Sequence, residues 1–201
     1  MPPEDTADTY QYVSNFMAKE EYLKKLGEVK LIVPKNQIKE GAFPNIYLPS
    51  TMGGVTSIAE NAKDKNVVLF FYPGDKEGLK YPELAGCTPE ACGFRDTIDV
   101  LERLNTKVFG ISFQLSKQQK QFIEGQHLNF PLLSDSEQLL SNALRLPYWI
   151  SNHDELYPCR QTYIITKGNE ISKVFDKVDP NRHIDEVLSE IKKLGNLPEL
   201  K

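Results

Sequence analysis

The stretch from Asn66 to Asp96 constrains the fold of this chain more than any other part of it. An apolar run, Val67 to Tyr72, ends at Pro73-Gly74. A polar loop follows, and Cys87 then stands directly before a helical pattern. A run of β-branched and aromatic residues that is bounded by turn residues predicts a buried central strand. The segment is therefore expected to form a strand, a loop with a thiol at its end, and a helix.

The residues after Cys87 are typical of a helix N-terminus. In Thr88-Pro89-Glu90 the hydroxyl can cap the helix, proline suits its first turn, and glutamate favours the positive end of the helix dipole. Backbone N–H groups at a helix start stabilise an anion, and the thiolate is the reactive form of cysteine. We therefore expect Cys87 to be a reactive thiol. Cys92 instead borders the apolar face of the helix, which is formed by Ala91, Phe94, Ile98 and Leu101.

These residues resemble the active-site motif of the peroxiredoxins and, more narrowly, that of the peroxiredoxin Q or bacterioferritin comigratory protein branch. The resemblance covers residues 41 to 194. It implies an α/β, thioredoxin-like fold with a mixed central sheet flanked by helices. The matching segments are Gly86-Cys87-Thr88, Ala91-Cys92-Gly93-Phe94, Arg95-Asp96, Phe109–Ser112, Phe130–Asp135, Arg160–Tyr163 and His183–Glu186.

The resemblance implies a thiol-dependent peroxidase that reduces hydrogen peroxide and organic hydroperoxides. Cys87 would attack the peroxide and become a sulfenic acid, which Cys92 would resolve as an intramolecular disulfide. Arg160 would stabilise the thiolate with its permanent charge. A thioredoxin- or glutaredoxin-type dithiol would then reduce the disulfide. The resemblance implies neither a metal ion nor an organic cofactor.

The loop before Cys87 departs from the family pattern. The family has a proline and a threonine seven and three residues before the peroxidatic cysteine, where this chain has Lys80 and Leu84. The loop is also longer than the pattern. Because the threonine hydroxyl contacts peroxide and thiolate, either another group replaces it or peroxide reduction is slow. The hydroxyls of Tyr81 and Thr88 are the nearest candidates, although each side chain is more simply explained as an ordinary exposed one.

Two other functions stay open from the sequence. One is a thiol–disulfide oxidoreductase with weak peroxidase activity, which the missing threonine favours. The other is a non-enzymatic interaction domain that presents its N-terminal helix and long loop. Cys159 is a less favoured resolving cysteine, because strand alternation turns its side chain away from that of Arg160. His183 is expected at a helix start as a packing residue.

The length of 201 residues fits one domain with an extension. We expect residues 1–40 to be a partly helical N-terminal extension and residues 41–201 to be the thioredoxin-like domain. A helix is predicted from Tyr10 to Leu26. Its apolar side is expected to carry Tyr12, Phe16, Leu23 and Leu26.

Composition narrows the classes of partner. A net charge of −4 and the lack of a basic tract argue against nucleic acid, and no apolar run is long enough to cross a membrane. Three cysteines, an odd number, do not make a structural disulfide framework. We therefore expect a cytoplasmic protein with reduced thiols, present as a monomer or weak dimer.

The remaining periodic segments predict strands alternating with helices, which indicates a mixed sheet covered on both sides. Tyr148 and Trp149 are expected to form a hydrophobic lid between elements. Strands are expected over residues 31–33, 43–48, 107–113, 131–133, 162–166 and 171–176, and helices over residues 57–62, 116–125, 137–144 and 180–194.

Overall fold

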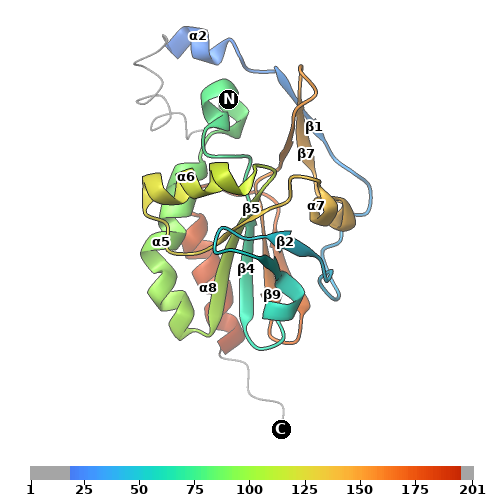
Figure 1. Cartoon of the computed structure of the whole chain (residues 1–201), viewed down its shortest axis with the longest axis vertical. Helices are drawn as coiled ribbons and strands as arrows, with labels where there is room; N and C mark the ends of the chain where they lie inside the picture. Colours follow the sequence, from blue (N-terminus) through green and yellow to red (C-terminus); the bar gives the residue numbers. More distant parts are fainter. Residues whose placement is uncertain (1–18, 196–201) are drawn as a thin grey trace.

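A computed structural model describes residues 19–195 (Figure 1). Its main sheet has five strands in the order β10-β9-β4-β5-β6. β4 runs parallel to β5 and antiparallel to β9, so the sheet is mixed, as predicted. These strands are β4 (Asn66–Phe71), β5 (Thr106–Ser112), β6 (Leu132–Ser134), β9 (Gln161–Thr166) and β10 (Glu170–Phe175).

Helices cover both faces of this sheet (Figure 1). Side-chain alternation along β4 sends Val68 and Phe70 to one face and Leu69 to the other. On the first face, Phe70 stacks on Phe94 with ring centroids 4.7 Å apart. That face carries α5 (Cys87–Arg103), α6 (Ser116–Gln126) and α8 (His183–Gly195), and the other carries α3 (Ile58–Asn61), α7 (Leu139–Leu144) and the hairpin of β2 (Tyr47–Pro49) and β3 (Val55–Ser57).

The predicted strand before Cys87 and helix after it are confirmed, but the N-cap of α5 and the starts of two later helices differ from the expectation. Gly86 is the N-cap of α5, with φ of +108° and no side-chain cap. Glycine adopts this φ without steric cost, so Thr88 lies inside the first turn and does not cap it. α7 begins at Leu139 and not at Glu137, and the final helix, α8, begins at His183 and not at Pro180.

The long segment before Cys87 folds into two short helices and is not an open loop. They are α4 (Glu77–Lys80) and the 3-10 helix η1 (Pro82–Leu84). Gly78 in α4 packs so closely on Ala85 that a Cβ there would lie 2.7 Å from the Ala85 Cα. We call residues 76–86 the insertion.

A second, three-stranded sheet packs against the insertion. It consists of β1 (Val29–Ile32), β7 (Tyr148–Ser151) and β8 (Leu156–Pro158), in the order β1-β7-β8. Its residues Val29 and Tyr157 share a small apolar core with Tyr81 and Leu84 of the insertion. Trp149 packs on this core from β7. Tyr148 and Trp149 thus belong to a strand, so the expectation that they lie between elements is wrong.

The N-terminal extension contributes α2 (Lys19–Leu23) and β1 to the described structure. Most of the helix predicted from Tyr10, with Tyr12 and Phe16, lies outside the described residues. Tyr22 is the buried side chain of α2, whereas Leu26 is 40% exposed, so the expected packed side is wrong at Leu26. Val29 pairs with Ser151 in the second sheet, which ties the extension to the rest of the chain. The boundary at residue 40 stays a prediction.

Candidate active site

Cys87 is the first residue of α5 and is 3% exposed. The backbone N–H of Gly74, after the end of β4, donates a hydrogen bond to its sulfur. Gly74 has φ of +140°, which side-chain-bearing residues rarely adopt. The Cys87 thiol lies 3.8 Å from the carbonyl oxygen of Leu84. The turn after β4 and the end of the insertion therefore enclose the sulfur.

Arg160 reaches Cys87 from the neighbouring part of the sheet. It directly precedes β9, the antiparallel neighbour of β4. Its Nη2 lies 3.2 Å from the Cys87 Sγ and 2.9 Å from the Ala85 carbonyl oxygen. Its Nη1 lies 2.5 Å from Glu90 Oε2. The structure therefore brings together Cys87 and Arg160, two of the three predicted site residues.

The pairing of Glu90 with Arg160 was not predicted from the sequence. The two side chains are 0% and 11% exposed, so this ion pair is buried. A buried guanidinium is stable only when it is paired and hydrogen-bonded. Glu90 follows Cys87 by three residues, and positions i and i+3 share one side of a helix. That spacing was the signal in the sequence that could have identified it.

Opposing effects act on the ionisation of Cys87. Burial raises the pKa of the Cys87 thiol, and the charge and hydrogen bond of Arg160, with the Gly74 N–H, offset part of that rise. Burial also raises the pKa of Cys159, to about 12, and no cation among the described residues opposes that rise. The helix start alone therefore does not produce the thiolate expected from the sequence, and the charge of Arg160 is the largest effect that favours it.

The Tyr81 hydroxyl, one of the two candidates to replace the threonine of the family motif, is bonded elsewhere. The Tyr81 Oη donates to Glu155 Oε2 at 3.3 Å, between β7 and β8. Leu84, at the position of the threonine, buries its side chain in the small apolar core. Thr88 lines the cavity beside Cys92. The candidate role for Tyr81 is therefore wrong, and Thr88 faces a different space.

Tyr72 brings a buried hydroxyl to the side of the sheet on which Cys87 lies. It continues the row of Val68 and Phe70 and belongs to the same apolar cluster as Cys87. Its hydroxyl oxygen is buried and has no hydrogen-bond partner among residues 19–195. Burial raises the pKa of Tyr72, and the nearby Cys87 adds to that rise, which outweighs the opposing effect of the neighbouring Ser112 and Gln119 side chains. The phenol therefore stays protonated and can donate. Strand alternation was the signal in the sequence that could have found it.

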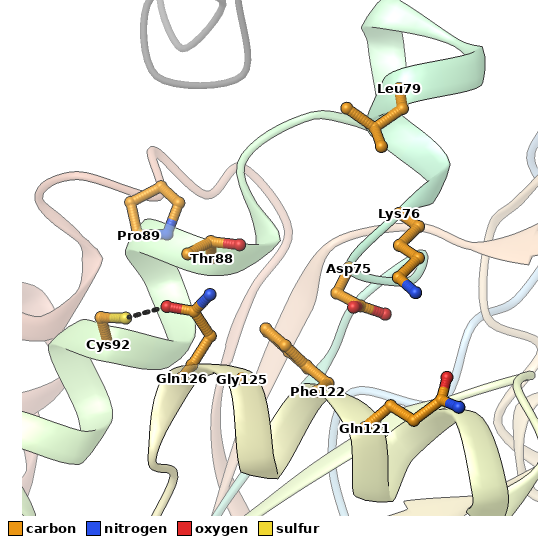
Figure 2. Close-up of a pocket in the computed structure, with 10 residues that line it drawn as sticks. All are labelled: Asp75, Lys76, Leu79, Thr88, Pro89, Cys92, Gln121, Phe122, Gly125 and Gln126. Atoms are coloured by element: carbon orange, nitrogen blue, oxygen red, sulfur yellow. Dashed lines mark hydrogen bonds between the residues drawn. The ribbon is translucent and has the colours of Figure 1, made fainter. Parts of the chain in front are cut away.

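A cavity of about 610 Å³ lies beside the first turns of α5. The Cys92 thiol faces Gln126 Oε1 at 3.7 Å, at one side of this cavity (Figure 2). Cys92 is thus partly exposed while Cys87 is enclosed. The cavity is lined by Asp75, Lys76, Leu79, Thr88, Pro89, Cys92, Gln121, Phe122, Gly125 and Gln126.

The intact helix keeps Cys87 and Cys92 apart. Five residues along a helix correspond to about 140° of rotation and about 7.5 Å of rise. A disulfide needs Cα atoms about 4.4–6.8 Å apart with their Cβ atoms facing each other. All three cysteines are unpaired. A bond between Cys87 and Cys92 therefore requires the first turn of α5 to unwind.

His183, the remaining candidate from the sequence, has a structural role. His183 is buried at the first position of α8, and its Nε2 lies 2.7 Å from Thr162 Oγ1, so its expected packing role is confirmed. Residues 19–195 contain no group of three His, Cys, Asp or Glu side chains that could hold a metal ion. Among the described helices, none combines the length and the apolar character needed to cross a bilayer.

Comparison with known proteins shows the family to which this sequence belongs. The AhpC/TSA family matches residues 40–174. The chain is 31% identical over 159 residues to the chloroplastic peroxiredoxin Q of Triticum aestivum, which covers 79% of this chain and 69% of that protein. It is 32% identical over 150 residues to the putative peroxiredoxin bcp of Coxiella burnetii, which covers 74% of this chain and 94% of that protein.

Solved structures agree with the fold. Peroxidoxin BcpB from Mycobacterium tuberculosis superposes with a TM-score of 0.68 at 25% identity, over 79% of this chain and 99% of that chain. A variant of PrxQ from Xylella fastidiosa superposes with a TM-score of 0.69 at 22% identity, over 81% of this chain and 99% of that chain. The predicted thioredoxin-like fold is confirmed.

Proposed function

Because this chain belongs to the AhpC/TSA family and is a peroxiredoxin of the peroxiredoxin Q type, we propose that Cys87, Cys92 and Arg160 carry out its thiol-dependent peroxidase reaction. The observation that supports this assignment best is the 3.2 Å contact between Arg160 Nη2 and Cys87 Sγ. It sets a permanent positive charge against the nucleophilic sulfur. Membership of this family also means that the chain is an enzyme and not a non-enzymatic interaction domain.

In the first step the Cys87 thiolate attacks one oxygen of the peroxide. A sulfur–oxygen bond forms, the O–O bond breaks, and the leaving oxygen takes up a proton to depart as water or an alcohol. Arg160 and the Gly74 N–H stabilise the negative charge, and the Tyr72 hydroxyl takes the place of the family threonine. A Xanthomonas campestris relative has been studied for alkyl peroxide reduction, which supports organic hydroperoxides as substrates here.

In the second step the Cys92 thiol attacks the Cys87 sulfenic acid. A disulfide forms and water leaves, after the first turn of α5 has unwound. A thioredoxin- or glutaredoxin-type dithiol reduces this disulfide by exchange. The partly exposed position of Cys92 beside the cavity supports its part in this step.

The test uses the purified protein, a hydroperoxide and a thioredoxin system. Cys87→Ser is expected to abolish peroxide consumption. Cys92→Ser should keep the first, stoichiometric turnover and lose the thioredoxin-supported cycle. Peroxide consumption that survives Cys87→Ser would overturn the assignment. Slow peroxide consumption with fast reduction of insulin disulfides would instead favour the thiol–disulfide oxidoreductase.

A cytoplasmic location and a monomeric or weakly dimeric state complete the proposal. The location is supported by the three unpaired cysteines, which suit a reducing compartment. Light scattering after gel filtration, repeated over a range of concentrations, would measure the oligomeric state.

A further inference from the structure

The insertion is fastened from outside by the N-terminal extension. The Tyr22 Oη donates to the carbonyl oxygen of Gly78 in α4, and the Tyr22 side chain is fully buried. The Gly27 N–H donates to Glu83 Oε1 in η1 at 2.6 Å. α2 and the turn after it therefore hold both short helices of the insertion.

A continuous series of contacts leads from Tyr22 to the reactive sulfur. Gly78, the partner of Tyr22, packs directly on Ala85. The Ala85 carbonyl oxygen accepts a hydrogen bond from Arg160 Nη2 at 2.9 Å, and the same nitrogen lies 3.2 Å from the Cys87 Sγ. Movement of the insertion would therefore disturb the residue that stabilises the thiolate.

The position of the insertion in the chain adds a second constraint. Ala85 and Gly86 directly precede Cys87, so the insertion fixes the upstream end of the segment that has to unwind. Val29 of β1, also from the extension, packs on Tyr81 and Leu84. The turn that contains Cys87 is thus held upstream by the insertion and at its side by Arg160.

We propose that Tyr22 and Gly27 form a clasp that holds the insertion against the active site, positions Arg160, and slows the unwinding of α5 that precedes disulfide formation. The proposal rests on the resolving role proposed for Cys92. Opening the clasp releases the upstream end of the Cys87 turn, so the sulfenic acid is resolved sooner.

The clasp also affects the competing oxidation of Cys87. A second hydroperoxide can transfer an oxygen to the sulfenic acid, which gives a sulfinic acid and releases an alcohol or water as the O–O bond breaks. This reaction depends on how long the sulfenic acid survives. A closed clasp therefore favours the sulfinic acid at high peroxide, and an open clasp favours the disulfide.

The test compares wild type with Tyr22→Phe, which removes only the hydroxyl. After one equivalent of peroxide, the Cys87–Cys92 disulfide is expected to form about 3- to 10-fold faster, the factor that one net hydrogen bond provides. The yield of sulfinic acid at high peroxide, measured by mass spectrometry, should fall by a similar factor. A merely structural role would change the melting temperature without changing this partition.

Tyr163→Phe is the matched control, because the Tyr163 Oη also donates to a backbone carbonyl oxygen, that of Ile38 at 2.7 Å, on the other face of the sheet. It should leave both rates unchanged. If Tyr22→Phe does not fold, Glu83→Gln, which weakens the bond from Gly27, gives the same measurement. Wild-type rates of disulfide formation in the folded variant would overturn the clasp. A wild-type protein that forms no Cys87–Cys92 disulfide would instead overturn the resolving role of Cys92.

Discussion

The guanidinium of Arg160 makes contacts that one ammonium group could not reproduce. Its two terminal nitrogens reach the Cys87 sulfur, the Glu90 carboxylate and the Ala85 carbonyl oxygen at the same time. Lysine offers a single charged nitrogen on a flexible stem. The site therefore depends on the fork of Arg160 as well as on its charge.

Replacement of Arg160 should slow peroxide reduction and raise the pKa of Cys87 further. Arg160→Lys is expected to lower the second-order rate constant on the order of 10- to 100-fold, since hydrogen bonds to charged groups contribute about 1.5–3 kcal/mol. Stopped-flow measurement with hydrogen peroxide gives the rate, and alkylation against pH gives the pKa. Arg145→Lys, at an exposed position outside the site, is the control. An unchanged rate constant would remove Arg160 from the reaction.

Replacement of Tyr72 should slow peroxide reduction without lowering the stability of the protein. Tyr72→Phe removes a buried hydroxyl that has no hydrogen-bond partner among the described residues, so the free energy of unfolding should stay the same or rise. The peroxide rate constant is expected to fall about 10-fold if this hydroxyl donates to the reacting atoms. Thr88→Val should leave the rate unchanged. The reverse result, a slow Thr88→Val and a fast Tyr72→Phe, would assign the threonine role to Thr88.

At the scale of elements, we expect pH to affect the docking of α8 on β9 through His183. Burial and, to a smaller extent, the charge of Arg160 lower the pKa of His183 to about 4, against the opposing charge of Asp179. Below the ordinary value of about 6.5 the unfolded chain therefore binds a proton that the folded chain does not. The free energy of unfolding should fall by about 2 kcal/mol between pH 7 and pH 5.

Urea unfolding at both pH values measures this effect. His183→Gln should flatten the difference, whereas His153→Gln, at an exposed position, should keep it. If the free energy of unfolding fell equally in the two variants between pH 7 and pH 5, groups other than His183 would control the acid sensitivity. Thr162 supplies the oxygen at 2.7 Å from the imidazole, so Thr162→Val should weaken the docking at either pH.

In the proposed catalytic cycle, the first turn of α5 is the element that changes. In the reduced protein, Cys87 begins a helix that continues to Arg103. Because the disulfide cannot form within helical geometry, oxidised protein should show faster amide exchange across residues 87–92 and less helix by circular dichroism. Pro89 assists the unwinding, since it contributes no N–H to the helix. Protection that is equal in the two redox states would contradict an intramolecular bond to Cys92.

At the scale of the whole molecule, local patterns predicted the main sheet, and long-range pairing explains what they missed. The strand before Cys87, the helix after it and the hairpin of residues 161–175 follow from periodicity and turn residues. The second sheet joins residues 29–32 to residues 148–151. Patterns between neighbouring residues do not predict a pairing of segments so far apart in the sequence. The matching motif located Cys87 and Arg160, but the insertion departs from that motif, so its partners Tyr22 and Tyr157 became visible only in the structure.

The redox state of Cys87 and Cys92 should also change the stability of the whole molecule. Oxidation must pull Cys87 out of the apolar cluster and separate Arg160 from its partners, and breaking a buried ion pair costs about 3–5 kcal/mol. A disulfide that closes so short a loop contributes only about 2 kcal/mol. The disulfide form should therefore be less stable than the dithiol form, which is the opposite of a structural disulfide.

We expect thermal unfolding of the oxidised protein to lie on the order of 5 °C below that of the reduced protein, given about 2–4 °C per kcal/mol at this chain length. Adding a dithiol should restore the higher midpoint, because Arg160 and Cys87 return to contact. Cys92→Ser treated with one equivalent of peroxide is the control, since its sulfenic acid leaves α5 helical and the midpoint nearly unchanged. A higher midpoint for the oxidised wild type would show that the Cys87 turn and its buried ion pair survive disulfide formation, and that the cysteine joined to Cys87 is not Cys92.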